Sequence, residues 1–83
     1  MKKLFVGGIN FNTTEDILKD HFKQYGNIQQ LILIRDRETG KSKGFAFITF
    51  ENSIDADKAK SELDGSTFDG RIIGVKDARE KTR

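Results

Sequence analysis

Apolar residues recur at two spacings along this chain, and a spacing of two residues predicts strands. The longest such stretch is KGFAFITF, residues 43–50. Alternate residues of a strand point to opposite faces of its sheet. One face of this predicted strand carries Ala46, Ile48 and Phe50, and the other carries Lys43, Phe45, Phe47 and Thr49. Both faces hold large apolar groups, although a core needs only one of them.

Three further stretches are predicted strands: KKLFVGG at residues 2–8, IQQLILIRD at 28–36 and GRIIGVKDA at 70–78. In the first, Leu4 and Val6 lie on one face and Phe5 on the other. The second is rich in β-branched and other apolar residues. A charged segment follows it, and Gly40 within that segment indicates a turn before residues 43–50.

Two segments show the spacing of amphipathic helices. Their apolar stripes are Leu18, Phe22 and Tyr25 in the first, and Ala56, Ala59 and Leu63 in the second. Thr13 is the expected N-cap of the first helix, in a capping box with Asp16 in place of the usual Glu, and Gly26 is its expected stop. Ser53 is the expected N-cap of the second helix, which Gly65 ends.

The predicted order is therefore strand, helix, strand, strand, helix, strand. This order predicts an α+β ferredoxin-like sandwich, with a four-stranded antiparallel sheet and two helices on one face. The expected core contains Leu4, Val6, Ile28, Leu31, Leu33, Ala46, Ile48, Phe50, Ile73 and Val75 of the sheet, and Leu18, Phe22, Ala56, Ala59 and Leu63 of the helices. Nothing remains to cover the second face.

The uncovered face is expected to hold Phe5, Ile32, Ile34, Phe45 and Phe47. Ordinary core packing is the plain alternative for the three rings, but both helices are already used on the other face. A small monomer rarely exposes such a continuous apolar patch unless something binds it. Three other residues receive structural interpretations only: Phe11 as a loop anchor, Phe68 in a turn, and His21 on a helix surface.

Composition places limits on function. The chain has 83 residues, a net charge of +2, a single histidine and no cysteine, so one small domain without disulfides or a metal site is expected. No apolar run approaches the roughly 18 residues of a membrane span, and no signal peptide is visible. We therefore expect an intracellular protein without membrane contact, in the nucleus or the cytoplasm. Residues 1–78 are the expected domain and residues 79–83 a basic tail.

A flat aromatic patch suits a nucleobase, because a base has a π-face of matching size whatever its identity. The bases of a duplex are already stacked, so the partner would be single-stranded. Basic residues are expected around the patch: Lys3, Lys43 and Lys76 on the same face, and Arg35, Arg37 and Lys41 at or near the turn. Such side chains contact phosphates or stack on bases. A solvated mixed-charge turn is the alternative for the turn residues, since Asp36 and Glu38 alternate with them.

The segment KGFAFITF resembles the octapeptide of the RNA-recognition motif family, K/R-G-F/Y-G/A-F-V-x-F/Y, with Ile48 in place of Val. The segment LFVGGI, residues 4–9, resembles the shorter hexapeptide of that family. The resemblance extends from Lys3 to about Ala78, and it is closest to the glycine-rich and heterogeneous nuclear ribonucleoprotein types.

The resemblance implies roles for individual residues. Phe5 and Phe47 would each stack a base, Phe45 would pack against sugars, and Lys43 would meet the phosphate backbone. Open-face residues of the outer strands would tune base preference: Gln30, Ile32, Ile34 and Lys76. Gly74 departs from the family, because many relatives carry a long polar side chain there, and Asp77 adds a negative charge beside the face.

The sequence thus predicts a monomeric binding domain for single-stranded RNA, with no cofactor. Single-stranded DNA is a possible ligand, since stacking ignores the 2′-hydroxyl. Two alternatives use the same face: a protein-interaction module and a homodimer. An enzyme is not expected, because no nucleophile-and-base pair or metal cluster is visible.

Overall fold

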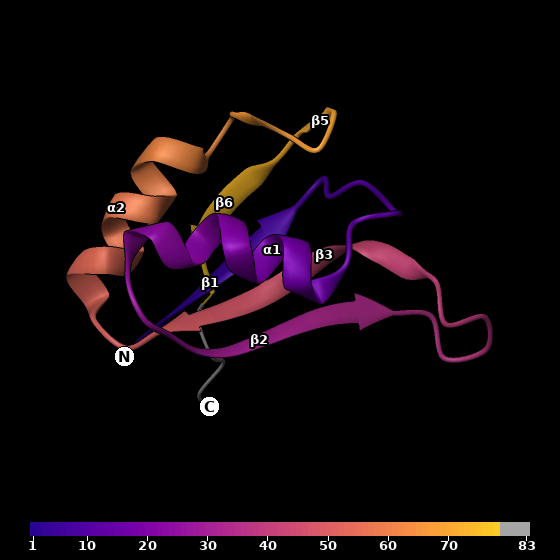
Figure 1. Ribbon diagram of the computed structural model, residues 1–83, viewed down its shortest axis with the longest axis horizontal. Helices are drawn as coiled ribbons and strands as arrows, with labels where there is room; N and C mark the ends of the chain where they lie inside the picture. Colours follow the sequence, from indigo (N-terminus) through magenta and orange to yellow (C-terminus); the bar gives the residue numbers. More distant parts are fainter. Residues whose placement is uncertain (79–83) are drawn as a thin grey trace.

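The computed structural model describes residues 1–78, which fold as a four-stranded sheet covered on one face by two helices (Figure 1). The predicted tail, residues 79–83, lies outside the described residues. The main elements are β1 (Lys2–Gly7), α1 (Glu15–Phe22), β2 (Ile28–Arg35), β3 (Ser42–Phe50), α2 (Ser53–Leu63) and β6 (Gly74–Asp77). A short 3-10 helix, η1 (Lys23–Tyr25), follows α1, and a small hairpin of β4 (Thr67–Phe68) and β5 (Arg71–Ile72) precedes β6.

The sheet has the strand order β2-β3-β1-β6, and every neighbouring pair is antiparallel. Consecutive strands β2 and β3 form a hairpin, while each helix carries the chain from one strand to a more distant one. The predicted α+β ferredoxin-like fold is therefore confirmed. Because both helices lie on the same side of the sheet in Figure 1, no helix or strand of residues 1–78 covers the opposite face, which is called the open face below.

The core lies between the two layers and follows the predicted alternation. Its sheet side contains Leu4, Val6, Leu33, Ala46, Ile48, Phe50, Ile73 and Val75, and its helix side Leu18, Phe22, Ala56, Ala59 and Leu63. Ile9 and Phe68 also belong to the core. Ile9 lies in the loop after β1. Phe68 lies on β4, so the short hairpin contributes to the core and not only to a surface turn.

A bulge in β2 explains how Ile28 and Leu31 both face the helices. Strict alternation would place residues three apart on opposite faces. Ile28 pairs with Phe50 and Gln30 pairs with Thr49, so β2 has one more residue than β3 in this interval. Such an extra residue shifts the alternation of the strand. Ile28 and Leu31 accordingly pack against the edge of the core as half-buried residues.

The helix N-termini differ by one residue from the predicted ones. Thr14, not Thr13, caps α1, and its hydroxyl accepts a hydrogen bond from the backbone N–H of Ile17 at 3.4 Å. Thr13 is instead buried, and its hydroxyl donates to the Asp69 carboxylate. Asn52, not Ser53, is the residue that precedes α2, and Ser53 is the first helical residue. Adjacent Thr–Thr and Asn–Ser pairs make either residue a chemically reasonable cap.

The helix ends lie close to the predicted positions. The α-helical part of the first helix stops at Phe22, and η1 continues the turn to Tyr25 before Gly26 ends it. The second helix stops at Leu63, one residue before its C-cap and two before Gly65. Gly65 has a positive φ of 81°, which glycine adopts at little cost.

The predicted last strand, residues 70–78, is wrong as a single strand. Its first part pairs locally, Thr67 with Ile72 and Phe68 with Arg71, and only Gly74–Asp77 joins the main sheet. Asp69 and Gly70 form the hairpin turn, with φ values of 52° and 84°. Two positive φ values are typical of a type I′ turn, and Asp-Gly is a strong sequence signal for it.

His21 differs from its prediction as a helix-surface residue. Its ring is half-buried and stacks on Phe68 of the hairpin, with 4.4 Å between ring centroids and 22° between planes. Burial lowers the pKa of His21 below its ordinary value of 6.5. Its Nε2 atom is buried and has no hydrogen-bond partner within residues 1–78. This environment favours the neutral imidazole.

Candidate nucleic-acid interface

The central row of the open face crosses all four strands of the sheet. Residues that pair directly in antiparallel strands point to the same face. Lys76 of β6 pairs with Phe5, Phe5 pairs with Phe47 of β3, and Phe47 pairs with Ile32 of β2. From β6 to β2, the row therefore consists of a lysine, two phenylalanines and an isoleucine. Ile32, which is 41 % exposed, extends the apolar surface to the edge of the sheet.

Three phenylalanine rings form the aromatic cluster of this face: Phe5, Phe45 and Phe47. The centroid of the Phe5 ring lies 5.5 Å from that of Phe47 and 5.8 Å from that of Phe45. The planes are tilted by 59° and 39°, so these rings support one another without stacking face to face. All three rings are half-buried, whereas the residues directly before and after each of them along the strand are buried. The predicted grouping of these rings on one surface therefore matches their positions.

Two glycines lie next to the cluster. Gly7 pairs with both Phe45 and Gly74, which gives a second row across β3, β1 and β6. A Cβ atom on Gly7 would lie 3.1 Å from the Phe5 ring, so the ring rests over this glycine. Gly74 leaves the β6 end of this row without a side chain.

A third row is polar and lies at the other side of the rings. Lys3 pairs with Thr49, and Thr49 pairs with Gln30 across β3. The Lys3 ammonium lies 5.2 Å from the centroid of the Phe47 ring, which is the range of a cation–π contact. The predicted open-face positions of Lys3 and Gln30 thus agree with the register.

Lys43 and the turn that precedes it flank the far end of the cluster. Lys43 is exposed on the same side of β3 as Phe45. Within the turn, the Asp36 carboxylate accepts hydrogen bonds from the backbone N–H groups of Glu38 and Thr39 at 2.8 and 3.1 Å. These bonds, with a smaller contribution from the charge of Lys43, lower the pKa of Asp36.

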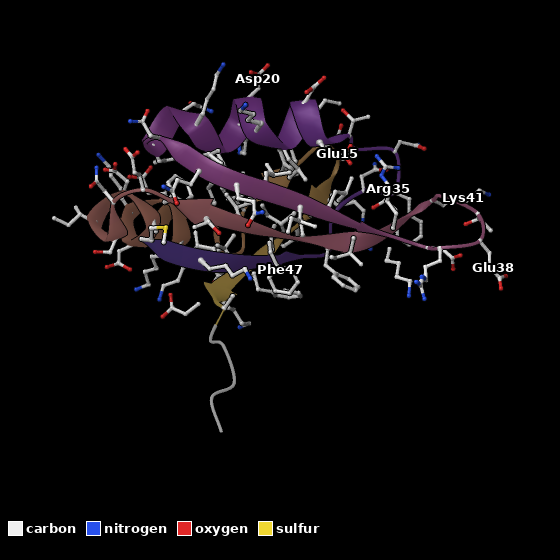
Figure 2. The ribbon with its side chains drawn as sticks, turned by 90° about the horizontal axis from the view of Figure 1, so that it is seen from below. Glu15, Asp20, Arg35, Glu38, Lys41 and Phe47 are labelled. Carbon is white, nitrogen blue, oxygen red and sulfur yellow. The ribbon has the colours of Figure 1, made fainter. Side chains whose placement is uncertain are left out.

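Arg35 does not join the open face. Its guanidinium makes two hydrogen bonds to the Glu15 carboxylate of α1, at 2.7 and 3.2 Å, and a third to the Gly40 carbonyl. Figure 2 shows Arg35 and Glu15 on the helix side of the sheet, with Phe47 on the opposite side. Arg35 has the same alternation as buried Leu33, so the sequence contained this information. Ile34, between them, points to the open side.

Asp77 also faces the helices. It pairs with inward-facing Leu4, and its carboxylate contacts the ammonium groups of Lys60 at 3.3 Å and Lys2 at 3.5 Å. The Lys60 hydrogen bond is the main cause of the lowered pKa of Asp77, with Lys2 adding to it. The expected negative charge beside the open face therefore points away from it, and two lysines balance it.

Within residues 1–78, no group of three or more His, Asp or Glu side chains is arranged to hold a metal ion. No helix in the same range is long and apolar enough to cross a membrane. What the open face offers is stacking surface and positive charge.

The family model described as the RNA recognition motif matches residues 4–74. The chain belongs to this family. The RNA recognition motif is a family of RNA-binding domains and not of enzymes, and the match includes both segments on which the sequence resemblance was based. The finer resemblance to glycine-rich and heterogeneous nuclear ribonucleoprotein types stays a prediction.

Solved structures of RNA recognition motifs superpose closely on this one. The crystal structure of RNA binding protein PG1 has a TM-score of 0.93 and 37 % sequence identity, over all of both chains. A Sxl-lethal protein in complex with RNA has a TM-score of 0.92 and 30 % identity, covering 98 % of this chain and 48 % of the other. The second RRM domain of the yeast poly(U)-binding protein Pub1 has a TM-score of 0.87 and 28 % identity, over all of both chains.

Proposed function

We propose that this RNA recognition motif binds single-stranded RNA across the open face of its sheet. The observation that carries the proposal is the cluster of Phe5, Phe45 and Phe47, held half-exposed on the one sheet face that no helix covers. A solved complex of a relative of this fold with RNA supports the same conclusion. Because the bases must be free to stack on the rings, the RNA is single-stranded at this site.

Phe5 and Phe47 each stack one base, and Phe45 packs against the sugar between them. Stacking on an aromatic side chain contributes about 1–3 kcal/mol per base. The separation of 5.5 Å between the Phe5 and Phe47 centroids, on neighbouring strands, suits successive nucleotides of one strand. Ile32 and Ile34 extend the apolar surface on β2.

Lysines supply the electrostatic part of binding. Lys43 lies at one end of the cluster, Lys3 at the other, and Lys76 pairs with Phe5 at the β6 side. Contacts with phosphates position the RNA without reading its sequence. Gln30, together with backbone groups of the outer strands, contacts base edges. Arg35 takes no part in this proposal, because Glu15 holds it on the helix side.

The binding unit is residues 1–78, acting as a monomer with no cofactor. Stacking does not require the 2′-hydroxyl, so single-stranded DNA also binds to the rings. An RNA preference then comes from contacts with the hydroxyl group, which serves as both donor and acceptor.

The direct test is an NMR titration of the domain with a random pool of short single-stranded RNAs. We expect the backbone amides of β1 and β3 to shift, and the Phe5→Ala/Phe47→Ala double variant to lose at least about tenfold in affinity while staying folded. Ile54→Ala is the matched control, because Ile54 is 79 % exposed but lies on α2, on the other side of the sheet.

Two results would contradict the proposal. One is RNA binding that moves α1 and α2 and leaves β1 and β3 unchanged. The other is a concentration-dependent mass in sedimentation that disappears in the double variant, which would show that the rings bind a second copy of the chain.

A further inference from the structure

The polar row beside Phe47 borders a shallow hollow in the open face. Its lining includes Lys3, Gln30 and Thr49 of this row, together with Met1, Lys2, Gln29 and Ala78. Residues two apart on one strand are separated by about 6.4–6.8 Å, so this row lies next to the row that contains Phe47. A base stacked on Phe47 therefore directs one of its edges toward this hollow.

Lys3 occupies the place that such a base needs. Its ammonium lies over the Phe47 ring, 5.2 Å from the centroid. The ammonium and a stacked base cannot share the same face of this ring. A cation–π contact at an exposed site is weak compared with base stacking, so the base displaces the ammonium. The long flexible side chain of Lys3 keeps the displaced charge close to the edge of the base.

The three polar side chains of the hollow differ in what they can recognise. The Thr49 hydroxyl and the Gln30 amide both donate and accept hydrogen bonds, so they adapt to any base edge. The Lys3 ammonium donates only. It can therefore donate a hydrogen bond to a carbonyl oxygen, as in uracil or guanine. Cytosine and adenine carry an amino group at the corresponding ring position, and this group is itself a donor. Lysine donating to the acceptors of guanine is a frequent specific contact in nucleic-acid recognition.

We infer that Lys3 makes the domain select a keto base, uracil or guanine, for the nucleotide stacked on Phe47. This inference rests on the proposed RNA-binding function and adds the chemical class of one base. A purely electrostatic role would place the same ammonium on a phosphate, where it could not distinguish bases.

The test uses pairs of bases that have nearly the same shape. Short homo-oligonucleotides of uridine and cytidine form one pair, and those of inosine and adenosine form the other. In each pair the first member carries a carbonyl oxygen where the second carries an amino group. Affinities are measured by fluorescence anisotropy at one salt concentration. We expect the native domain to bind the keto member about tenfold more tightly in both pairs, and Lys3→Met to bind both members alike.

Lys58→Met is the control with the same change of charge. Lys58 is exposed on α2, on the other side of the sheet. This variant should keep the keto preference. A second readout follows the Lys3 side chain directly: its methylene protons, shifted by the Phe47 ring current in the free domain, should move toward ordinary values when the uridine oligonucleotide binds.

Three outcomes would overturn the inference. Equal loss of affinity for all four oligonucleotides in Lys3→Met assigns the ammonium to a phosphate. Equal affinities of the native domain for both members of each pair, with binding still dependent on Phe47, remove the keto selection and leave the proposed function intact. No binding of any oligonucleotide removes the proposed function as well.

Discussion

Gly44 shows most directly how one residue fixes the shape of the binding strand. It lies between Lys43 and Phe45, with a φ of 87°, which side chains other than glycine rarely adopt. A Cβ atom here would lie 2.9 Å from the Phe11 ring and 3.1 Å from the Ile9 carbonyl oxygen. The Gly44 carbonyl accepts a hydrogen bond from the Ile9 N–H at 2.8 Å, so the loop after β1 is held against β3.

Gly44→Ala should therefore destabilise the domain more than an alanine at another left-handed glycine. Gly40 is the matched control, because its φ is 75° and a Cβ atom there would meet no atom of the described chain within 4 Å. We expect the shared backbone cost to be roughly 1–2 kcal/mol at both positions, with an added cost of at least about 1 kcal/mol for the crowding at Gly44. Urea unfolding of the two variants measures the difference; equal losses would contradict this account.

The placement of individual side chains was also the feature that the sequence predicted least well. The face of the sheet on which Arg35 lies could be predicted from its alternation with Leu33. The positive charges of the nearby turn instead favoured the prediction that Arg35 contacts RNA. The burial of His21 could not be predicted, since its partner Phe68 belongs to a strand of two residues. Periodicity has no meaning over so short a segment, although the Asp-Gly pair that follows was a usable hairpin signal.

At the scale of elements, the hairpin β4–β5 links the loop after β1 with α1. Asp69 at its tip accepts a hydrogen bond from Thr13, and the Asp69 carbonyl accepts one from the Asn10 amide at 3.0 Å. Phe68 packs into the core and against the His21 ring. The hairpin therefore closes the end of the core nearest to these loops.

This packing predicts that stability depends on pH through His21. Burial lowers its pKa in the folded state, so protons favour the unfolded chain. Stability is fully present above the ordinary pKa of 6.5 and is lost as the pH falls through the lower folded value. Urea unfolding between neutral and mildly acidic pH should show a decline in the native domain that His21→Phe lacks. An identical decline in both proteins would assign it to other groups.

The main elements could be predicted because their apolar patterns are long. Residues 43–50 and the stripes of both helices extend over several repeats, which fixes both the type of element and its buried face. The bulge in β2 was already implied by the expected burial of both Ile28 and Leu31. The exact caps could not be predicted, since neighbouring hydroxyl or amide residues compete for the same role.

At the scale of the whole molecule, the charged side chains on the two faces of the sheet differ in whether they form ion pairs. On the helix side, charges are paired across elements, as in Arg35–Glu15, Lys2–Asp57 and Lys60–Asp77. On the open side, no ion pair is formed by Lys3, Lys43 or Lys76 with any of residues 1–78. The small net charge of +2 therefore understates the positive potential of the open face.

The salt dependence of RNA affinity should separate these two groups of charges. For a single strand, each phosphate contact contributes about −0.7 to the slope of log affinity against log salt. We expect Lys43→Gln to make the slope shallower by about that amount, and Arg35→Gln to leave it unchanged. Fluorescence anisotropy at several salt concentrations measures both slopes. A shallower slope in Arg35→Gln would return this residue to the RNA site.

The location of Tyr25 has a practical consequence for such measurements. The chain has this single tyrosine and no tryptophan, so Tyr25 alone accounts for the intrinsic fluorescence excited at longer ultraviolet wavelengths. Its hydroxyl donates to the Glu62 carboxylate of α2 at 3.2 Å, on the helix side of the molecule. Its emission should change when the helices separate on unfolding. After correction for the ultraviolet absorption of the bases, it should stay constant when they cover the opposite surface. The domain thus carries a built-in optical reporter of folding that lies away from its ligand.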